Sequence, residues 1–230
     1  YWDQAGNAEF RPSLGLVGGT SLPLSSYPTQ HASPFVMSED ATLSIPVADI
    51  LKNDTDPDND ALSVTAVSNA KNGTVSLADG VVTFTQNANF SGIAQFDYTI
   101  SDGHGGTSKA TVYVDVTPIN DAPVLAAETK TTLEDTTLTV SAANGLLAND
   151  SDVDGNALTV TQFSVNFGGT TYTFAAGQTT PASSFGQLRI NADGSYTFVP
   201  GANFNGALAT VTYTVSDGTT TRTSTLDLSV

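Results

Sequence analysis

The sequence lacks cysteine entirely, and across its 230 residues it has only 7 lysine and arginine residues against 23 aspartate and glutamate residues. Without thiols, neither a disulfide framework nor a metal site with cysteine ligands is possible. The formal net charge of -16 disfavours nucleic acid and anionic lipid as partners, because both require a positive protein surface. A soluble protein that seeks cations is the simplest interpretation.

Long apolar runs are also missing, so the sequence predicts neither a signal peptide nor direct membrane insertion. The chain begins with tyrosine instead of methionine, which is typical of a processed or excised segment. No stretch sustains a helical period. Apolar and polar residues instead alternate in several short segments, such as 111–116 and 225–230, and this period of two predicts strands with one buried face.

One acidic segment occurs twice, at residues 51–62 and 147–158, and each copy contains Asn-Asp-x-Asp-x-Asp followed by Ala-Leu. Two further motifs recur in the same order, Asn-Phe-x-Gly and Tyr-Thr-x-Ser-Asp-Gly. The chain is therefore two copies of one module of about a hundred residues. We expect an N-terminal arm or remnant of a preceding module at 1–33, one sandwich at 34–119 and a second at 120–230.

Each copy has short strands with turn signals between them, including Asp79-Gly80 and Asp193-Gly194. The Asp-Gly dipeptide tolerates the positive φ angles of tight hairpins, so we expect the same hairpin in both copies. An all-β fold follows, with two tandem immunoglobulin- or cadherin-like Greek-key β-sandwiches and an extended N-terminal arm. The second copy is longer and predicts an inserted hairpin around 166–186, either a lengthened surface loop, which we favour, or a ligand-contacting protrusion that carries Tyr172.

Carboxylates stand at alternate positions in the acidic segments, as in Asp54, Asp56, Asp58 and Asp60. In an extended chain such side chains lie about 6.6 Å apart on one face. Hard cations such as Ca²⁺ prefer oxygen ligands of this kind, whereas a solvated acidic loop is the alternative. Repetition of the spacing in both copies favours a metal.

The second acidic segment imitates the opening of an EF-hand loop, but the rest of that pattern fails. Position twelve of an EF-hand loop is a bidentate glutamate, whereas the two copies have Thr65 and Thr161 there. The flanking segments also predict strands, not helices. The sequence therefore disfavours a helical calcium switch.

Together with the Asn-Asp-Ala-Pro linker at 120–123, these motifs resemble the bacterial cadherin-like tandem repeats of calcium-dependent surface adhesins. The resemblance covers residues 34–230 and implies seven-stranded sandwiches that bind Ca²⁺ near their junctions. It also implies a secreted, extracellular or cell-surface location, where calcium is abundant. The metal ligands that it implies are Asp54, Asp56, Asp58, Asp102, Asn120, Asp121, Asp150, Asp152, Asp154 and Asp217.

Two acidic pairs leave alternatives open. Glu39-Asp40 and Glu134-Asp135 precede the acidic segments, and they either complete the metal sites or simply sit at strand starts. The first copy also lacks a linker like Asn120-Asp121, so the second copy holds the stronger candidate for an occupied site.

The preferred function is a calcium-rigidified extender or adhesion segment of an extracellular bacterial surface protein, and not an enzyme. Its partners are neighbouring modules or other copies of the chain, with a cell-surface or glycan ligand as a further option. One alternative is a filament subunit in which residues 13–24 add a strand to a neighbouring copy. A carbohydrate-binding module, with Trp2, Tyr27 and Tyr172 as its only candidate aromatics, is less favoured.

Overall fold

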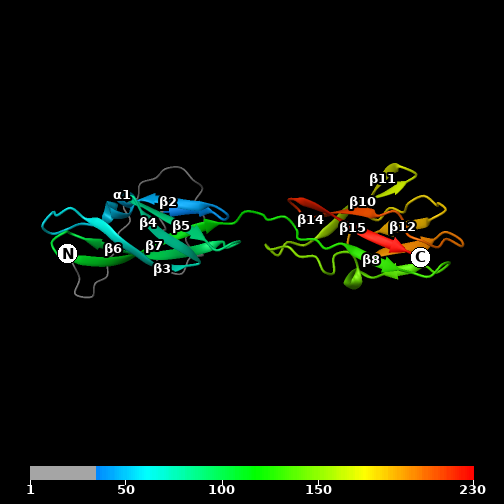
Figure 1. The fold of residues 1–230 in the computed structure, drawn as a ribbon, viewed down its shortest axis with the longest axis horizontal. Coiled ribbons are helices and arrows are strands. Elements are labelled where there is room, and N and C mark those ends of the chain that lie inside the picture. The colour runs from blue at the N-terminus through cyan, green and yellow to red at the C-terminus, as the bar shows by residue number, and fades with distance from the viewer. Residues whose placement is uncertain (1–34) are drawn as a thin grey trace. The chain divides into compact units, whose positions relative to one another are not determined.

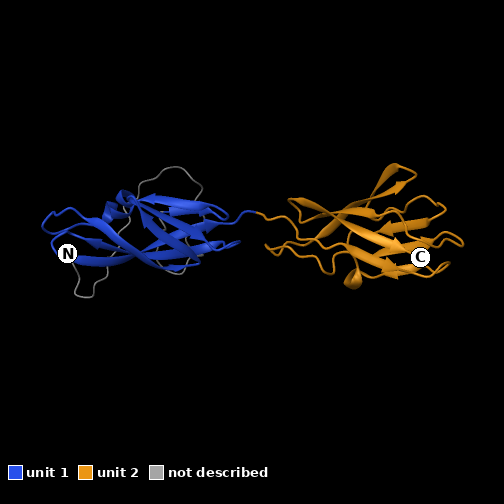
Figure 2. Ribbon diagram, viewed as in Figure 1, with its two compact units in different colours: residues 1–119 blue, residues 120–230 orange. Residues whose placement is uncertain are grey.

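The computed structural model describes residues 35–230, so the predictions for Trp2, Tyr27 and residues 13–24 lie outside the described range. The chain divides into two compact units, residues 1–119 and 120–230 (Figure 2). The described part of each is a β-sandwich, which confirms the predicted fold class. Helical structure in residues 35–230 is limited to α1 (Val47–Ile50) and the 3-10 turns η2 (Leu51–Asn53) and η3 (Ala142–Asn144). None of these described helices has the length and hydrophobicity to cross a bilayer.

The first unit has two sheets, with strand orders β1-β7-β6-β3 and β2-β5-β4 (Figure 1). Successive strands change sheet several times, as from β2 to β3 and from β5 to β6, which is the Greek-key arrangement. Strand β1 pairs parallel with β7, and the other pairs are antiparallel. The strands are β1 (Phe35–Ser38), β2 (Thr42–Pro46), β3 (Ser63–Lys71), β4 (Gly73–Ala78), β5 (Val81–Gln86), β6 (Gly92–Ser101) and β7 (Thr107–Thr117).

The second unit repeats this topology and adds one strand, with orders β11-β10-β14-β15-β8 and β12-β13-β9. The added strand β11 forms a hairpin with β10 through Gly168 and Gly169, which have φ angles of 60° and 87°. The strands are β8 (Glu128–Thr131), β9 (Leu138–Val140), β10 (Thr159–Phe167), β11 (Thr170–Ala175), β12 (Gly186–Ile190), β13 (Tyr196–Pro200), β14 (Val211–Ser216) and β15 (Thr221–Ser229).

Alternation along the strands builds each core. In β7, Val112, Val114 and Val116 are all buried, as the period of two predicts. The two cores are made separately, one from strands of each unit. Aromatic stacking occurs in both, between Phe84 and Phe96 with ring centroids 5.9 Å apart, and between Phe163 and Phe174 at 5.4 Å.

The Asp-Gly hairpins recur, but their turns differ. Asp79 and Gly80 have φ angles of 50° and 75°, which suits the two-residue turn that joins β4 to β5. Between β12 and β13 the loop has residues 191–195, and of the dipeptide only Gly194 has a positive φ. Asp193 there accepts hydrogen bonds from the backbone N–H of Ser195 at 3.0 Å and its hydroxyl at 2.6 Å, which stabilises the longer turn.

Candidate metal centres

The acidic loop of the first unit is folded into a turn, whereas the sequence predicted an extended ladder. The Oδ1 atom of Asp56 accepts hydrogen bonds from the backbone N–H groups of Asp58 at 2.8 Å and Asp60 at 3.1 Å. This pattern is an Asx turn, in which an aspartate side chain bonds the backbone that follows it. One carboxylate oxygen from each of Asp56, Asp58 and Asp60 lies within 4.8 Å of the others.

The spacing of these three oxygens suits a calcium ion. Ca²⁺–oxygen distances of about 2.3 to 2.6 Å allow ligand oxygens on opposite sides to be separated by about 5 Å. Two unit charges 4.8 Å apart repel by about 1 kcal/mol in water and by about 3.5 kcal/mol at an effective dielectric of 20. A divalent cation removes this repulsion, so the residues present fit Ca²⁺.

Asp54 lines a surface hollow with Asp56 and Asp60, and it also accepts hydrogen bonds from a core tyrosine. The hydroxyl of Tyr98, a 4 % exposed residue of β6, donates to both carboxylate oxygens of Asp54, at 2.9 and 3.2 Å. Burial raises the pKa of Asp54, and the hydrogen bond from Tyr98 opposes that rise. Burial also raises the pKa of Tyr98, and the charge of Asp54 adds to the effect. The sequence did not separate Asp54 from its neighbours, nor did it single out Asp60 as a ligand.

Asp102 shapes the turn between β6 and β7. Its Oδ1 atom accepts hydrogen bonds from the backbone N–H groups of His104 at 2.7 Å and Gly106 at 2.9 Å. The bond from His104 is the main reason that the pKa of Asp102 lies below its usual range. Asp102 lines the same surface hollow as Asp56 and Asp58, so the structure brings these three predicted residues together.

In the second unit, Asp152 organises the acidic loop as Asp56 does in the first. Its Oδ1 atom accepts from the backbone N–H groups of Asp154 at 3.0 Å and Asn156 at 3.1 Å. Its other oxygen, Oδ2, is buried and has no hydrogen-bond partner among residues 35–230. A buried carboxylate oxygen without a donor is costly, and a cation is one way to satisfy it.

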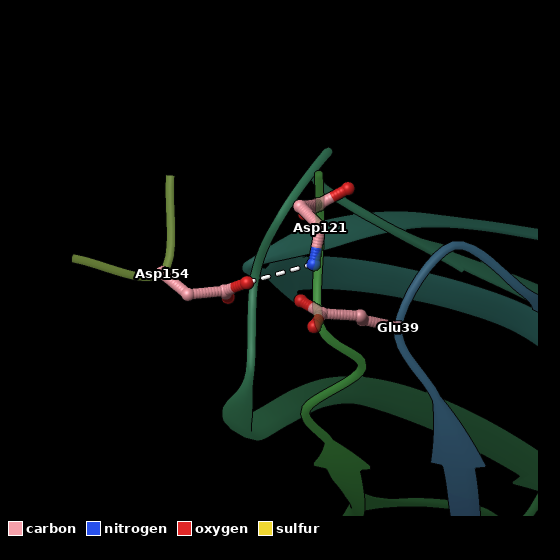
Figure 3. Close-up of side chains that lie close together, drawn as sticks. All are labelled: Glu39, Asp121 and Asp154. Atoms are coloured by element: carbon pink, nitrogen blue, oxygen red, sulfur yellow. Dashed lines mark hydrogen bonds between the residues drawn. The ribbon is translucent and has the colours of Figure 1, made fainter. Parts of the chain in front are cut away.

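The linker residues join this loop through hydrogen bonds. Asp154 accepts from the backbone N–H of Asp121 at 2.8 Å (Figure 3). The Asn156 amide donates to the side-chain oxygen of Asn120 at 3.0 Å, and the Asn120 amide donates to Asp217 at 2.9 Å. We call these six residues the loop network: Asn120, Asp121, Asp152, Asp154, Asn156 and Asp217. Asn156 was not predicted, although it occupies the position of Asp60 in the first copy.

Asp217 is the most fully bonded member of the loop network. It is buried, and it accepts hydrogen bonds from the backbone N–H groups of Thr219 and Thr220, both at 2.6 Å. The Thr220 hydroxyl at 2.6 Å and the Asn120 amide complete its set of donors. The bond from Asn120, then those from Thr220, hold the pKa of Asp217 far below its usual range. Because a carboxylate accepts about four hydrogen bonds, Asp217 is saturated and orients Asn120.

Asp150 bonds outside the loop network. Its Oδ1 atom accepts from the backbone N–H of Ala126 at 2.9 Å, and its buried Oδ2 atom has no partner within the described chain. Burial raises the pKa of Asp150, and the nearby charge of Glu128 raises it further. Glu128 was not predicted as a site residue, because no acidic motif surrounds it.

One residue of each upstream acid pair accepts a hydrogen bond from the backbone. Glu39 is 3 % exposed, and its carboxylate accepts from the backbone N–H of Ile119, the last residue of the first unit. Asp135 accepts from the backbone N–H of Asn203 at 3.1 Å and has a positive φ of 57°. Glu134 is exposed.

The chain has two sandwiches of the same topology, and each has an acidic loop organised by an aspartate side chain. This arrangement is that of a tandem repeat of β-sandwich modules. Residues 25–115 match the family model described as bacterial Ig domain, and residues 120–230 match that of the bacterial cadherin-like domain. The first part of the chain thus matches the bacterial Ig family and the second part the bacterial cadherin-like family, and these matches confirm the predicted resemblance. Both are families of structural modules and not of enzymes.

Several solved structures resemble the chain at low identity. Human mucin-like protocadherin EC1-2 is 16 % identical with a TM-score of 0.43, over 85 % of this chain and 94 % of that one. Mouse cadherin-23 EC22-24 is 15 % identical with a TM-score of 0.43, over 76 % and 56 %. An endo-fucoidan hydrolase of glycoside hydrolase family 107 is 16 % identical with a TM-score of 0.29, over 86 % and 28 %. The chain thus spans less than a third of that hydrolase, and no curated protein sequence matches it.

Proposed function

We propose that the chain is a calcium-binding structural segment of an extracellular bacterial surface protein, in which Ca²⁺ stiffens the connection into the second unit. Domains of the two matched families are typically extracellular surface modules, and cadherin-like domains generally bind calcium. The observation that carries the proposal is the unsatisfied Oδ2 atom of Asp152 inside the loop network. The turn around Asp56 is the corresponding candidate in the first unit.

The loop network contains the hard oxygen donors that Ca²⁺ requires. Asp152 and Asp154 supply carboxylates, and the side-chain oxygen of Asn120 supplies a neutral ligand. Asn120 and Asp121 directly follow Ile119, where the second unit begins. An ion bound by these residues therefore restrains the backbone through which the second unit is attached. This is how calcium acts as a stiffener in the proposal.

The expected stabilisation follows from mass action. Extracellular calcium modules have dissociation constants of about 10⁻⁴ to 10⁻³ M. At a free calcium concentration about ten times the dissociation constant, one site adds about 1.4 kcal/mol to the free energy of unfolding. For a domain of about a hundred residues this corresponds to a rise in melting temperature of about 5 °C or more.

Calorimetry tests this proposal. Titration of the full chain with Ca²⁺ should release or absorb heat, and scanning calorimetry should show the second unit melting higher than in chelator. The double variant Asp152→Asn with Asp154→Asn keeps the side-chain shapes but removes two charges, so it should bind fewer Ca²⁺ ions than the wild type and show a smaller rise in the melting temperature of the second unit. Asp193→Asn, in the turn between β12 and β13, is the matched control and should retain them. A wild-type chain that shows no heat and no shift in melting temperature in millimolar calcium contradicts the proposal.

The glycan alternative has limited support among the described residues. Tyr172 on β11 is 48 % exposed, but its ring packs against Phe167 with centroids 6.0 Å apart. It is the one aromatic among the exposed large hydrophobic residues of the described chain. Sandwiches that bind sugars by stacking need an exposed ring surface, which a single partly packed tyrosine supplies poorly. The structural role is therefore preferred.

A further inference from the structure

Glu128 faces the interior side of its sheet. It lies on β8, in register with Leu226 of β15, which is fully buried. Directly paired residues on neighbouring strands project from the same face of a sheet. Ser224, two residues before Leu226, lies on that face as well and pairs with Tyr213, which is also fully buried. The register therefore places the Glu128 carboxylate on the face that carries Tyr213.

Tyr196 approaches from the opposite sheet. It lies on β13, pairs with Val140 and Ile190, and is only 2 % exposed. Its hydroxyl has no hydrogen-bond partner anywhere in residues 35–230, although buried hydroxyls nearly always have one. Tyr196 and Tyr213 belong to the same core cluster, and Glu128 lies on the sheet face that carries Tyr213. Burial raises the pKa of Tyr196 to about 12, and the charge of Glu128 raises it further.

Two carboxylates in this region have unsatisfied buried oxygens. They are Oε1 of Glu128 and Oδ2 of Asp150, and neither has a hydrogen-bond partner among the described residues. Neither residue takes part in an ion pair within residues 35–230, and the charge of Glu128 raises the pKa of Asp150. Like charges that are partly shielded from water repel each other unless a cation lies between them.

In the first unit, the aspartate at the position equivalent to Asp150 has both carboxylate oxygens satisfied by a tyrosine hydroxyl. There, Tyr98 donates to both oxygens of Asp54, the counterpart of Asp150. In the second unit, Tyr213 instead donates to the carbonyl oxygen of Ala126 at 3.2 Å, and the Ser224 hydroxyl donates to the same oxygen at 2.6 Å. In the second unit the carbonyl oxygen of Ala126 is thus the acceptor for the tyrosine hydroxyl, in place of the aspartate carboxylate. Asp150 is left with an oxygen that needs another partner.

We propose that Glu128, Asp150 and Tyr196 bind a hard divalent cation of the Ca²⁺ type within the second sandwich, at a site separate from the loop network. Two carboxylates balance the charge of such an ion. The phenol oxygen of Tyr196 has a lone pair and adds a neutral ligand. Tyr196 is the observation that distinguishes this site from a mere acidic cluster, because its buried hydroxyl lacks a partner within residues 35–230. The site stands independently of the proposed function, which concerns Asp152 and Asp154.

The test compares three variants of the full chain with the wild type, in chelator and in Ca²⁺. Glu128→Gln removes one of two repelling charges, so it should melt higher than the wild type in chelator. In Ca²⁺ it should melt lower than the wild type, because it loses this ion. Tyr196→Phe should be at least as stable as the wild type in chelator and bind this ion about tenfold more weakly. Asp154→Asn should lose the loop ion and keep the inner one.

The binding isotherms and a paramagnetic probe separate the outcomes. With Mn²⁺ as the probe, the backbone NMR signal of Tyr196 should broaden more strongly in Asp154→Asn, which keeps the inner ion, than in Glu128→Gln, which keeps only the loop ion. A Glu128→Gln variant that binds Ca²⁺ with the wild-type number of ions and affinity overturns the inner site and leaves the loop proposal standing. A variant that melts higher than the wild type by the same amount with and without Ca²⁺ also overturns it, because repulsion is then relieved without any ion.

Discussion

Replacing Tyr98 by phenylalanine removes a single hydroxyl and leaves the packing of β6 unchanged. That hydroxyl donates to both oxygens of Asp54, at 2.9 and 3.2 Å. A hydrogen bond to a charged group contributes about 1.5 to 3 kcal/mol, so we expect Tyr98→Phe to lower the free energy of unfolding of the first unit by that amount at pH 7. Tyr213→Phe in the second unit is the matched control, because its hydroxyl donates to the neutral carbonyl of Ala126 at 3.2 Å. Its loss should be about 0.5 to 1.5 kcal/mol.

The loss in Tyr98→Phe should depend on pH. The folded-state pKa of Asp54 is already raised above 3.8 by burial, and the hydroxyl of Tyr98 opposes that rise, so its removal raises the pKa further. A carboxyl with a raised folded-state pKa contributes stability below its unfolded pKa, and that stability is lost as pH rises through the folded pKa. The free energy of unfolding of the variant should therefore be closest to that of the wild type near pH 3 and furthest below it at pH 7.

Urea unfolding followed by amide NMR signals distinguishes the two units, because signals of β6 report the first and signals of β14 report the second. Chelator in every sample keeps ions away from the neighbouring carboxylates. A loss in Tyr98→Phe that is equal at pH 3 and pH 7 would refute the assignment of Asp54 as the acceptor that matters. A larger loss in Tyr213→Phe than in Tyr98→Phe would refute the argument from charge.

Two further substitutions test the packing of the second unit by urea unfolding. Phe198→Ala removes a ring that is 1 % exposed and should lower the free energy of unfolding by about 3 to 5 kcal/mol. Val199→Ala, at a residue that is 42 % exposed on the same strand, should lower it by less than about 1 kcal/mol. Equal losses would contradict the assigned faces of β13. Gly186→Ala places a Cβ atom 2.0 Å from the carbonyl oxygen of Val199 at a φ of +118°, and it should cost more than Gly206→Ala, where φ is +129° but nothing lies within 4 Å. Similar losses in the two variants would mean that backbone strain alone decides the effect.

The fold could be predicted because its determinants are local. Alternation in the segments around Val114 and Leu226 requires one buried face, and repetition of the motifs required two modules. The difference between the turns at Asp79 and Asp193 was not visible, because the same dipeptide fits a two-residue turn or part of a longer loop. Turn length depends on strand pairing, which the dipeptide does not determine.

The candidate sites were predictable only in outline. Asp54 and Asp150 occupy the same position in the repeat, yet one accepts from a tyrosine hydroxyl and the other from the backbone N–H of Ala126. That difference arises from the segment around Ala126, which precedes Asp150 by 24 residues and bonds both Asp150 and Tyr213. Glu128 escaped prediction for a similar reason, because only the register with Leu226 reveals that it faces inward.

The parallel pairing of the first described strand with the last strand in each unit has a mechanical consequence. In the first unit β1 pairs with β7 from Phe35↔Val114 to Ser38↔Thr117. In the second unit β8 pairs with β15 from Glu128↔Leu226 to Thr131↔Ser229. Tension along the chain pulls β1 and β7 toward opposite ends of their shared ladder. The hydrogen bonds of the ladder are then loaded together in shear, instead of one after another as in peeling. Each sandwich thus carries a tensile load through backbone bonds that join the beginning of its sheet to its end.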